Sequence, residues 1–279
     1  MRGSPVGKAL ILTAALAAGL IIAGGQVAVY ASEQDDEDIK NAIIRYKTAI
    51  EANPNNPATR MKLGRMYLLS NDTAGAIAEF KAAIKLSPDN SEAHAGLARA
   101  LVRKGDLENA TVSLKNAVKL DPNNADLHYK LGQLLSRRQK LDEAIAEFRQ
   151  AIKLYPDLGG AHRDLGAALG LKGDFDAQIF EEKKALELAP NDGDTFYYLG
   201  TAYISKGQPE EALKNLQRSV ELDGRNIDAR HLLGVAQAAT GDLASAIKTE
   251  EAALEMDPGN QAIKQTLQKM RSKVGGKGR

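Results

Sequence analysis

Residues 125–158 read ADLHYKLGQLLSRRQKLDEAIAEFRQAIKLYPDL, and this stretch decides the fold. Its apolar side chains recur every three or four positions in both halves, around Leu131 in the first and Phe148 in the second. This spacing is typical of amphipathic helices, because it places the apolar side chains on one face. The stretch therefore predicts two helices, over residues 127–137 and 142–154, joined by a short turn.

The residues around these helices support a closely packed pair. Asp142 is a suitable N-cap for the second helix. Pro156 ends that helix, because proline lacks a backbone N–H and clashes with the preceding turn. Small residues stand at Gly132, Ala144 and Ala151. Bulky side chains there would push the helices apart, so we expect the two backbones to approach closely.

The same pattern returns every 34 residues, which is the signature of a repeat protein. One series runs through Pro54, Pro88, Pro122, Pro156, Pro190, Gly224 and Pro258. A second runs through Leu63, Leu97, Leu131, Leu165, Leu199 and Leu233, each followed by glycine or alanine. The sequence therefore predicts six tandem repeats, numbered here one to six: 57–90, 91–124, 125–158, 159–192, 193–226 and 227–260.

The pattern is similar to the tetratricopeptide repeat (TPR). Repeat one carries it as Leu63-Gly64, Tyr67, Ala76, Phe80, Ala83 and Pro88. The resemblance implies an all-α fold, a right-handed superhelical solenoid of antiparallel helix pairs. Five residues depart from the family pattern, and we expect looser packing in repeats four to six, where they occur: Gln178, Glu182, Ser219, Gly224 and Glu250.

The two ends of the array differ from the repeats. Residues 32–56 resemble the second helix of a repeat whose first helix is missing, so they are predicted to form a half-repeat cap. Residues 261–274 are predicted to form a polar capping helix, with Ile263, Leu267 and Met270 on its apolar stripe. The tail 275–279 has nothing to bury and is expected to be disordered.

Residues 1–31 indicate export. Arg2 and Lys8 precede an uncharged run, and Val29 and Ala31 fit the small-residue rule of a signal-peptidase site. The run is also long enough to cross a bilayer, so an uncleaved transmembrane helix is the alternative. In either case we expect a periplasmic or extracytoplasmic chain, soluble after signal cleavage or anchored by one N-terminal helix. Membrane contact would involve residues 9–31 only if they are retained.

Composition and motifs argue against catalysis. The chain has no cysteine, which excludes disulfides and thiolate metal sites. Its net charge of +1 gives no general attraction to nucleic acid. It contains no Gly-rich phosphate loop, HExxH motif or Gly-x-Ser-x-Gly elbow. We therefore expect no enzymatic activity, no cofactor and no nucleic-acid partner.

Two polar patterns have structural interpretations. His94, His128 and His162 recur at position four of their repeats, but helices packed about 8–10 Å apart cannot bring three rings to one metal ion. His231 stands one position later and is expected on a different face. The acidic pairs Asp142-Glu143 and Glu181-Glu182 are expected at helix starts or on solvated faces.

Positions four, seven, eight and eleven of each first helix are predicted to be buried. In the TPR family positions two, five, nine, twelve and thirteen line a concave groove, and we call these the groove positions. Arginines gather there in the first four repeats, whereas the later groove positions are expected to be neutral to apolar. The candidate binding residues are Arg65, Arg99, Arg103, Tyr129, Arg137, Arg163, Tyr197, Thr201, His231 and Val235.

The arginines at groove positions suit an extended acidic segment of a partner protein. A solvated face that happens to carry arginine is the alternative. The favoured function is an exported TPR scaffold or adaptor for protein–protein interactions at the cell envelope. The alternatives are a structural homo-oligomer, or a non-catalytic subunit of an envelope enzyme or secretion complex.

Overall fold

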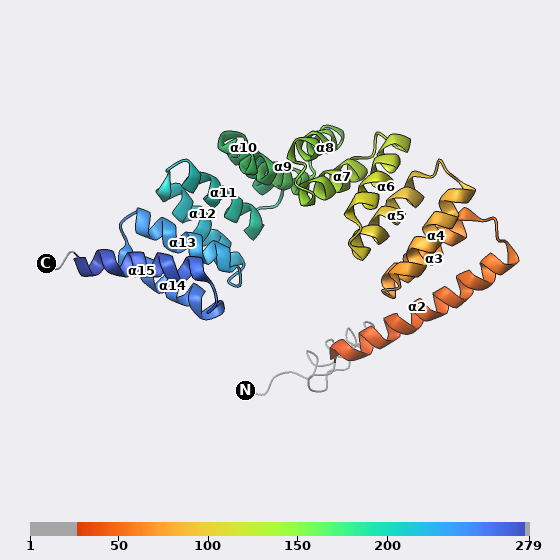
Figure 1. The fold of residues 1–279 in the computed structure, drawn as a ribbon, viewed down its shortest axis with the longest axis horizontal. Helices are drawn as coiled ribbons and strands as arrows, with labels where there is room; N and C mark the ends of the chain where they lie inside the picture. Colours follow the sequence, from red (N-terminus) through yellow and green to blue (C-terminus); the bar gives the residue numbers. More distant parts are fainter. Residues whose placement is uncertain (1–26, 277–279) are drawn as a thin grey trace, which may run out of the picture. The chain divides into compact units, whose positions relative to one another are not determined.

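The computed structural model describes residues 27–276, which form fourteen α-helices and no strand (Figure 1). The all-α repeat fold predicted from the sequence is confirmed. In chain order the helices are α2 (Val27–Ala52), α3 (Pro57–Leu69), α4 (Thr73–Leu86), α5 (Ser91–Lys104), α6 (Leu107–Leu120), α7 (Ala125–Arg137), α8 (Leu141–Leu154), α9 (Gly159–Leu171), α10 (Phe175–Leu188), α11 (Gly193–Ser205), α12 (Pro209–Leu222), α13 (Ile227–Ala239), α14 (Leu243–Met256) and α15 (Gln261–Gly276).

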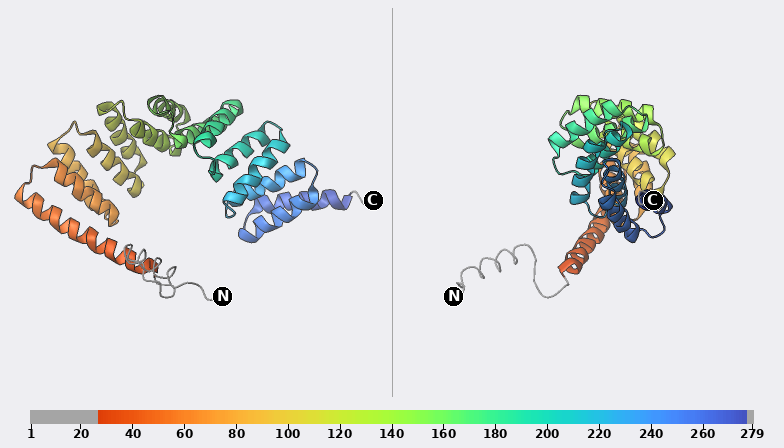
Figure 2. Two further views of the ribbon diagram at one scale, coloured as in Figure 1. Left: turned by 180° about the vertical axis from the view of Figure 1, so that it is seen from behind. Right: turned by 90° about the vertical axis from the view of Figure 1, so that its left-hand side faces the viewer.

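The described chain divides into two compact parts, with the boundary between residues 120 and 121. The first part contains α2–α6 and the second contains α7–α15. Within each part every helix packs against the next one along the chain, as two further views also show (Figure 2). Each helix therefore buries its apolar face against its neighbours in sequence, as expected for a repeat array.

Side-chain caps explain where most helices begin. Asn56, Asn90, Asn124 and Asn226 each accept a hydrogen bond from a first-turn N–H of α3, α5, α7 and α13. Asp72, Asp174 and Asp242 do the same for α4, α10 and α14. Asparagine and aspartate are preferred at this position because they satisfy an N–H that has no partner within the helix.

The start of α8 corrects one prediction. Asp142 lies inside the first turn of α8, and the N-cap position belongs to Lys140, whose side chain makes no capping hydrogen bond. The turn before it is also unusual, because Gln139 has a φ of 59°. Glycine holds the corresponding left-handed position in other repeats, at Gly105, Gly173, Gly207 and Gly241.

Close helix packing depends on position eight. A Cβ placed on Gly132 would lie 2.6 Å from the ring of Phe148, so α7 approaches α8 at the distance that only glycine allows. The leucines at position seven are buried in every repeat. The buried face is wider than predicted, because positions three and ten are also filled by buried residues such as Leu127 and Leu134.

Polar residues replace the expected core side chains in the later repeats, and they too are buried. The amide of Gln178 donates to the Tyr198 carbonyl at 3.0 Å. The hydroxyl of Ser219 donates to the Gly193 carbonyl at 2.9 Å. These bonds satisfy polar groups that would otherwise be costly to bury.

The terminal helices cover the ends of the array. On α15 the predicted stripe of Ile263, Leu267 and Met270 is buried, and the helix runs to Gly276, two residues past the predicted end. Residues 277–279 lie outside the described range. At the other end α2 packs on α3 as a single helix without a pair partner.

The export prediction falls mainly on residues 1–26, which lie outside the described range. Residues 29–31, which include the predicted cleavage site, belong by their backbone to α2. Within residues 27–276 no helix has the length and hydropathy needed to span a membrane.

Candidate functional site

The first part has three arginines at groove positions, and two of them are bonded to neighbouring groups of the chain. Arg65 forms an ion pair with Glu92 of the next repeat. Arg103 donates to the Leu68 carbonyl at the end of α3. Arg99 is exposed and has no hydrogen-bond or ion-pair partner within residues 27–276. Arg99 is therefore the arginine of this part most available to a ligand.

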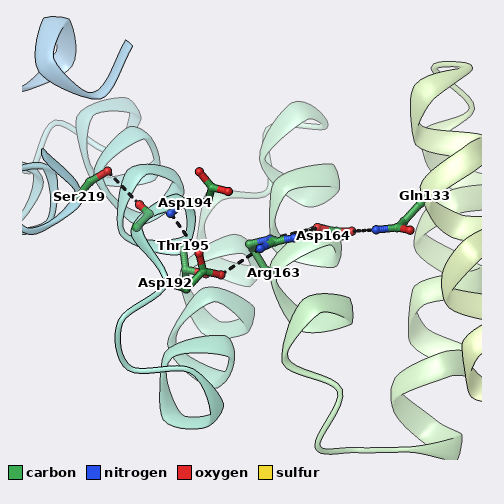
Figure 3. Close-up of polar contacts among 8 residues, drawn as sticks. Gln133, Arg163, Asp164, Asp192, Asp194, Thr195 and Ser219 are labelled. Carbon is green, nitrogen blue, oxygen red and sulfur yellow. Dashed lines mark hydrogen bonds and ion pairs between the residues drawn. The ribbon is translucent and has the colours of Figure 1, made fainter. Parts of the chain in front are cut away.

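In the second part Arg163 of α9 stands at the centre of a polar network (Figure 3). Its guanidinium lies 3.1 Å from Asp164 and 3.0 Å from Asp192, which precedes α11. Gln133 of α7 donates to the same Asp164 carboxylate at 2.8 Å. A continuous chain of hydrogen bonds therefore links the first helices of repeats three, four and five.

Asp192 is itself held in place by the start of α11. It accepts the N–H of Asp194 at 3.2 Å and the hydroxyl of Thr195 at 3.0 Å. The neighbouring Arg137, by contrast, is exposed and has no ion-pair partner within the described residues.

Tyr129 flanks the network from α7. Its ring lies against Phe148, with the ring centroids 6.0 Å apart. Its hydroxyl lies over α9, 2.7 Å from the point where a Cβ would stand on Gly160. Burial raises the pKa of Tyr129, and the nearby Asp164 carboxylate raises it further. Tyr129 therefore presents a neutral hydroxyl next to the charged groups.

The remaining candidates on α11 and α13 are half-buried. The ring of Tyr197 meets Tyr198 edge-on, with centroids 5.3 Å apart. The Thr201 hydroxyl donates back to the Tyr198 carbonyl at 2.7 Å, so it is engaged by its own helix. Val235 supplies a half-buried apolar side chain.

His231 is paired rather than free. Its Nδ1 lies 2.9 Å from the carboxylate of Glu250, which is fully buried on α14. This hydrogen bond raises the pKa of His231, against the opposing effect of burial. The imidazole and the carboxylate therefore stabilise each other between the two helices of repeat six.

Glu182 corrects a prediction. It was expected on a solvated face, but it is fully buried on α10, and neither carboxylate oxygen has a hydrogen-bond partner. Burial raises its pKa to about 10, although Arg163 acts in the opposite direction. The carboxyl group is therefore protonated and neutral at physiological pH.

The later groove positions also differ from the expectation of a neutral to apolar surface. Asp194 and Asp228 are exposed at position two of α11 and α13. A pocket of about 230 Å³ is lined by Asn191, Asp192, Gly193, Asp194, Leu222 and Asp223. The surface is acidic, with Arg163 partly neutralised by its own neighbours.

The three histidines at position four bind the preceding loop. Their Nε2 atoms lie 2.9–3.0 Å from the carbonyls of Pro88, Pro122 and Pro156. In two of them Nδ1 also lies 2.6 Å from a glutamate of the second helix, Glu147 or Glu181. Within residues 27–276 no group of three or more potential ligands is placed to hold a metal ion.

Comparison with solved structures places this architecture among known repeat proteins. YrrB, described as a TPR protein with an unusual peptide-binding site, is 24% identical over 67% of this chain and 96% of its own, with a TM-score of 0.60. PilW, a widely conserved type IV pilus biogenesis factor, is 21% identical over 76% of this chain and 98% of its own, with a TM-score of 0.66.

A third similar structure is the Cut9-Hcn1 hetero-tetramer of APC/C, at 17% identity and a TM-score of 0.64. The match covers 83% of this chain but 46% of that one, so this chain spans about half its length. Identities this low show the shared fold alone. A search of curated proteins gave no significant match.

Family models give the sequence-level result. The cytochrome c-type biogenesis protein H TPR domain matches residues 27–162. A general tetratricopeptide repeat model matches residues 197–261. Together with the 34-residue period, the buried leucines and the paired helices, these matches establish that the chain belongs to the tetratricopeptide repeat family.

Proposed function

We propose that this chain is an exported scaffold that binds extended segments of partner proteins at the groove positions of its first helices. The observation that carries this proposal is the contrast between two faces of those helices. Position seven holds a buried leucine throughout, whereas position five of repeats three to six holds half-buried Tyr129, Arg163, Tyr197 and His231. Aromatic and arginine side chains that remain accessible are the types enriched in protein-binding sites.

The polar groups at these positions suit binding better than catalysis. Arg163, Gln133 and Thr201 are held by hydrogen bonds to neighbouring groups, and none of them activates a nucleophile. A preorganised surface of this kind lowers the entropy lost when a flexible segment binds. TPR proteins typically act as non-catalytic scaffolds, and YrrB is one with a peptide-binding site.

We propose that the envelope is where this scaffold works. Residues 1–31 have the pattern of a signal peptide or single anchor. The family model that matches residues 27–162 is named for cytochrome c-type biogenesis, and the similar PilW is a pilus biogenesis factor. N-terminal sequencing of the protein from native membrane and periplasmic fractions tests the proposal. A full-length chain in the cytosol would contradict it.

We expect the first part to favour acidic segments through Arg99, which has no partner within the described residues, and through Arg103, which is exposed although it also donates to the Leu68 carbonyl. Exposed charges of this kind speed association and are screened over about 8 Å at physiological ionic strength. The double variant R99E/R103E should capture partners from an envelope extract several-fold more slowly, with the difference shrinking as salt rises. Binding kinetics at two salt concentrations measure this.

The matched control changes the same number of charges on the second helices. Lys81 and Lys119 are exposed on α4 and α6, so K81E/K119E alters net charge equally but leaves the groove positions intact. Circular dichroism should show unchanged helix content in both variants. Equal capture rates for R99E/R103E and wild type would mean that these arginines lie on a solvated face and do not contribute to partner binding.

A further inference from the structure

Glu182 is the one glutamate or aspartate within residues 27–276 whose carboxyl is buried without any hydrogen-bond partner. It stands at position 24, which holds Phe80, Leu114, Phe148 and Leu216 in repeats one, two, three and five. Its Oε1 lies 2.7 Å from the point where a Cβ would stand on Gly166. The carboxyl group therefore points at α9, one helical turn from Arg163.

Charged groups from three segments of the chain act on the Glu182 carboxyl. Arg163 and Asp164 of α9, Glu181 of its own helix α10, and Asp192 of the loop before α11 act on it electrostatically. Tyr198 of α11 also lies within electrostatic range of Glu182. Of these groups Arg163 carries the only positive charge, and its guanidinium is bonded to Asp164 and Asp192 instead.

Repeat six shows the alternative arrangement of the same two positions. Glu250 at position 24 lies beneath Gly234, as Glu182 lies beneath Gly166. There the residue at position five, His231, turns inward and bonds the buried carboxylate at 2.9 Å. Position five can therefore reach position 24 across a glycine at position eight. Arg163 has a longer side chain than His231 and stands at the same position.

We propose that the Asp164 and Asp192 carboxylates form a site for a cationic side chain of a partner protein, with Arg163 as its internal occupant. When a lysine or arginine of the partner takes that place, Arg163 turns inward onto Glu182. This inference rests on the proposed function and names the chemistry that repeat four would recognise. The Glu182 carboxyl is the second partner for the Arg163 guanidinium, and this makes the exchange possible.

Charge complementarity favours a cationic segment at this surface. Arg163 is the one lysine or arginine among the groove positions of α9, α11 and α13. Asp164 and Asp192 are bonded to it, and Asp194 and Asp228 occupy position two of the next two first helices. An incoming lysine restores the charge that Arg163 withdraws from the two aspartates. The site differs in this respect from the arginine-bearing groove positions of the first part.

The exchange has a defined proton balance. While Arg163 is paired with Asp164 and Asp192, the Glu182 carboxyl is protonated because it is buried. With Arg163 on Glu182, the ion pair favours the carboxylate, and the proton leaves to bulk solvent. One proton is therefore released for each cationic side chain bound, at a pH between the two pKa values of Glu182.

The test uses the full chain and two capped peptides, Ac-GSAKAKASG-NH2 and its glutamate counterpart Ac-GSAEAEASG-NH2. An NMR titration at pH 7.5 follows the side-chain carboxyl carbon of Glu182 and the Nε–H of Arg163. We expect the lysine peptide to shift both signals, with the Glu182 carbon moving to its ionised position. The glutamate peptide should bind at least tenfold more weakly.

Two variants separate the parts of the proposal. D164N/D192N should weaken lysine-peptide binding at least tenfold, and asparagine keeps the cap of α11 because it is itself a preferred N-cap. E182Q keeps the shape but cannot ionise, so it should release no proton and bind the peptide several-fold more weakly. Calorimetry in two buffers of different ionisation enthalpy counts the protons released.

Each remaining outcome overturns a stated part. No binding of the lysine peptide, or equal binding of both peptides, overturns the cation site. Binding that leaves the Glu182 carboxyl protonated overturns the movement of Arg163. Partner capture through Arg99 and Arg103 is a separate measurement. A negative result with the peptides therefore does not decide the scaffold function, which is tested by partner capture.

Discussion

Repeats four and six bury a glutamate at the same position, but the two carboxyl groups differ in their hydrogen bonding. Glu182 and Glu250 are both fully buried beneath a glycine of the first helix. Glu250 is bonded to His231, whereas Glu182 has no partner because Arg163 faces two aspartates. The comparison teaches that the residue at position five, together with its outer neighbours, decides whether the buried carboxyl is an ion-pair partner or a neutral acid.

The largest expected effect is the removal of the partner in repeat six. His231→Leu leaves Glu250 buried without a hydrogen bond, and breaking a buried pair in this way costs about 3 kcal/mol. We expect a loss of about 2–3 kcal/mol in unfolding free energy, because His231 is partly exposed. Urea denaturation of the full chain measures it. In a Glu250→Leu background the same substitution should cost little, and an equal cost in both backgrounds would rule out the pairing.

A smaller effect of opposite sign is expected in repeat four. Glu182→Leu removes an unsatisfied buried carboxyl and installs the side chain that repeats two and five carry at this position. A gain of about 1–3 kcal/mol follows from the removed desolvation penalty. Glu250→Leu is the matched control and should give no gain, because it also deprives His231 of its partner. A stability loss in Glu182→Leu would mean that the carboxyl has a partner after all.

The smallest expected effect, taken over one pH unit, is the pH dependence of the unfolding free energy. The pKa of Glu182 is raised to about 10 in the folded chain, so the folded state keeps a proton that the unfolded state releases. Stability should therefore fall as pH rises from about 5 to 9, by at most ~1.4 kcal/mol per pH unit. Glu182→Gln should flatten this slope. Denaturation curves at pH 6, 7, 8 and 9 measure it, and parallel slopes in the two proteins would contradict it.

His231 adds a second pH-dependent contribution with its own window. Its pKa is raised in the folded state by the bond to Glu250, so its contribution is present at low pH and is lost as pH rises through the raised value. A His231 variant should lose this contribution while keeping the slope that belongs to Glu182. The two residues can thus be separated in one series of measurements.

Most of the fold followed from the sequence because each repeat restates it. The buried leucines at position seven and the glycines at position eight, with alanine in repeat two, are local features that recur in register, so six copies remove the ambiguity of one. Positions three and ten were missed because alanine there, as at Ala168, is small enough to fit either a buried or an exposed face.

The candidate site was predicted less completely. Arg163 was identified by its position, but its partners Asp164 and Asp192 lie outside the groove positions, and their roles depend on side-chain direction. Glu182 was assigned to solvent by the rule for paired acidic residues on helices. Its place at position 24, where four other repeats carry phenylalanine or leucine, indicates burial instead, and the structure shows that this position was the better guide.

The turn between α7 and α8 has a consequence for motion. Gln139 holds a left-handed conformation that glycine adopts more easily, and Lys140 offers no side-chain acceptor to the first N–H groups of α8. At the start of α10, Asp174 supplies that acceptor. Local opening takes less free energy where fewer bonds must break, so we expect the amide hydrogens at the start of α8 to exchange with solvent sooner than those at the start of α10.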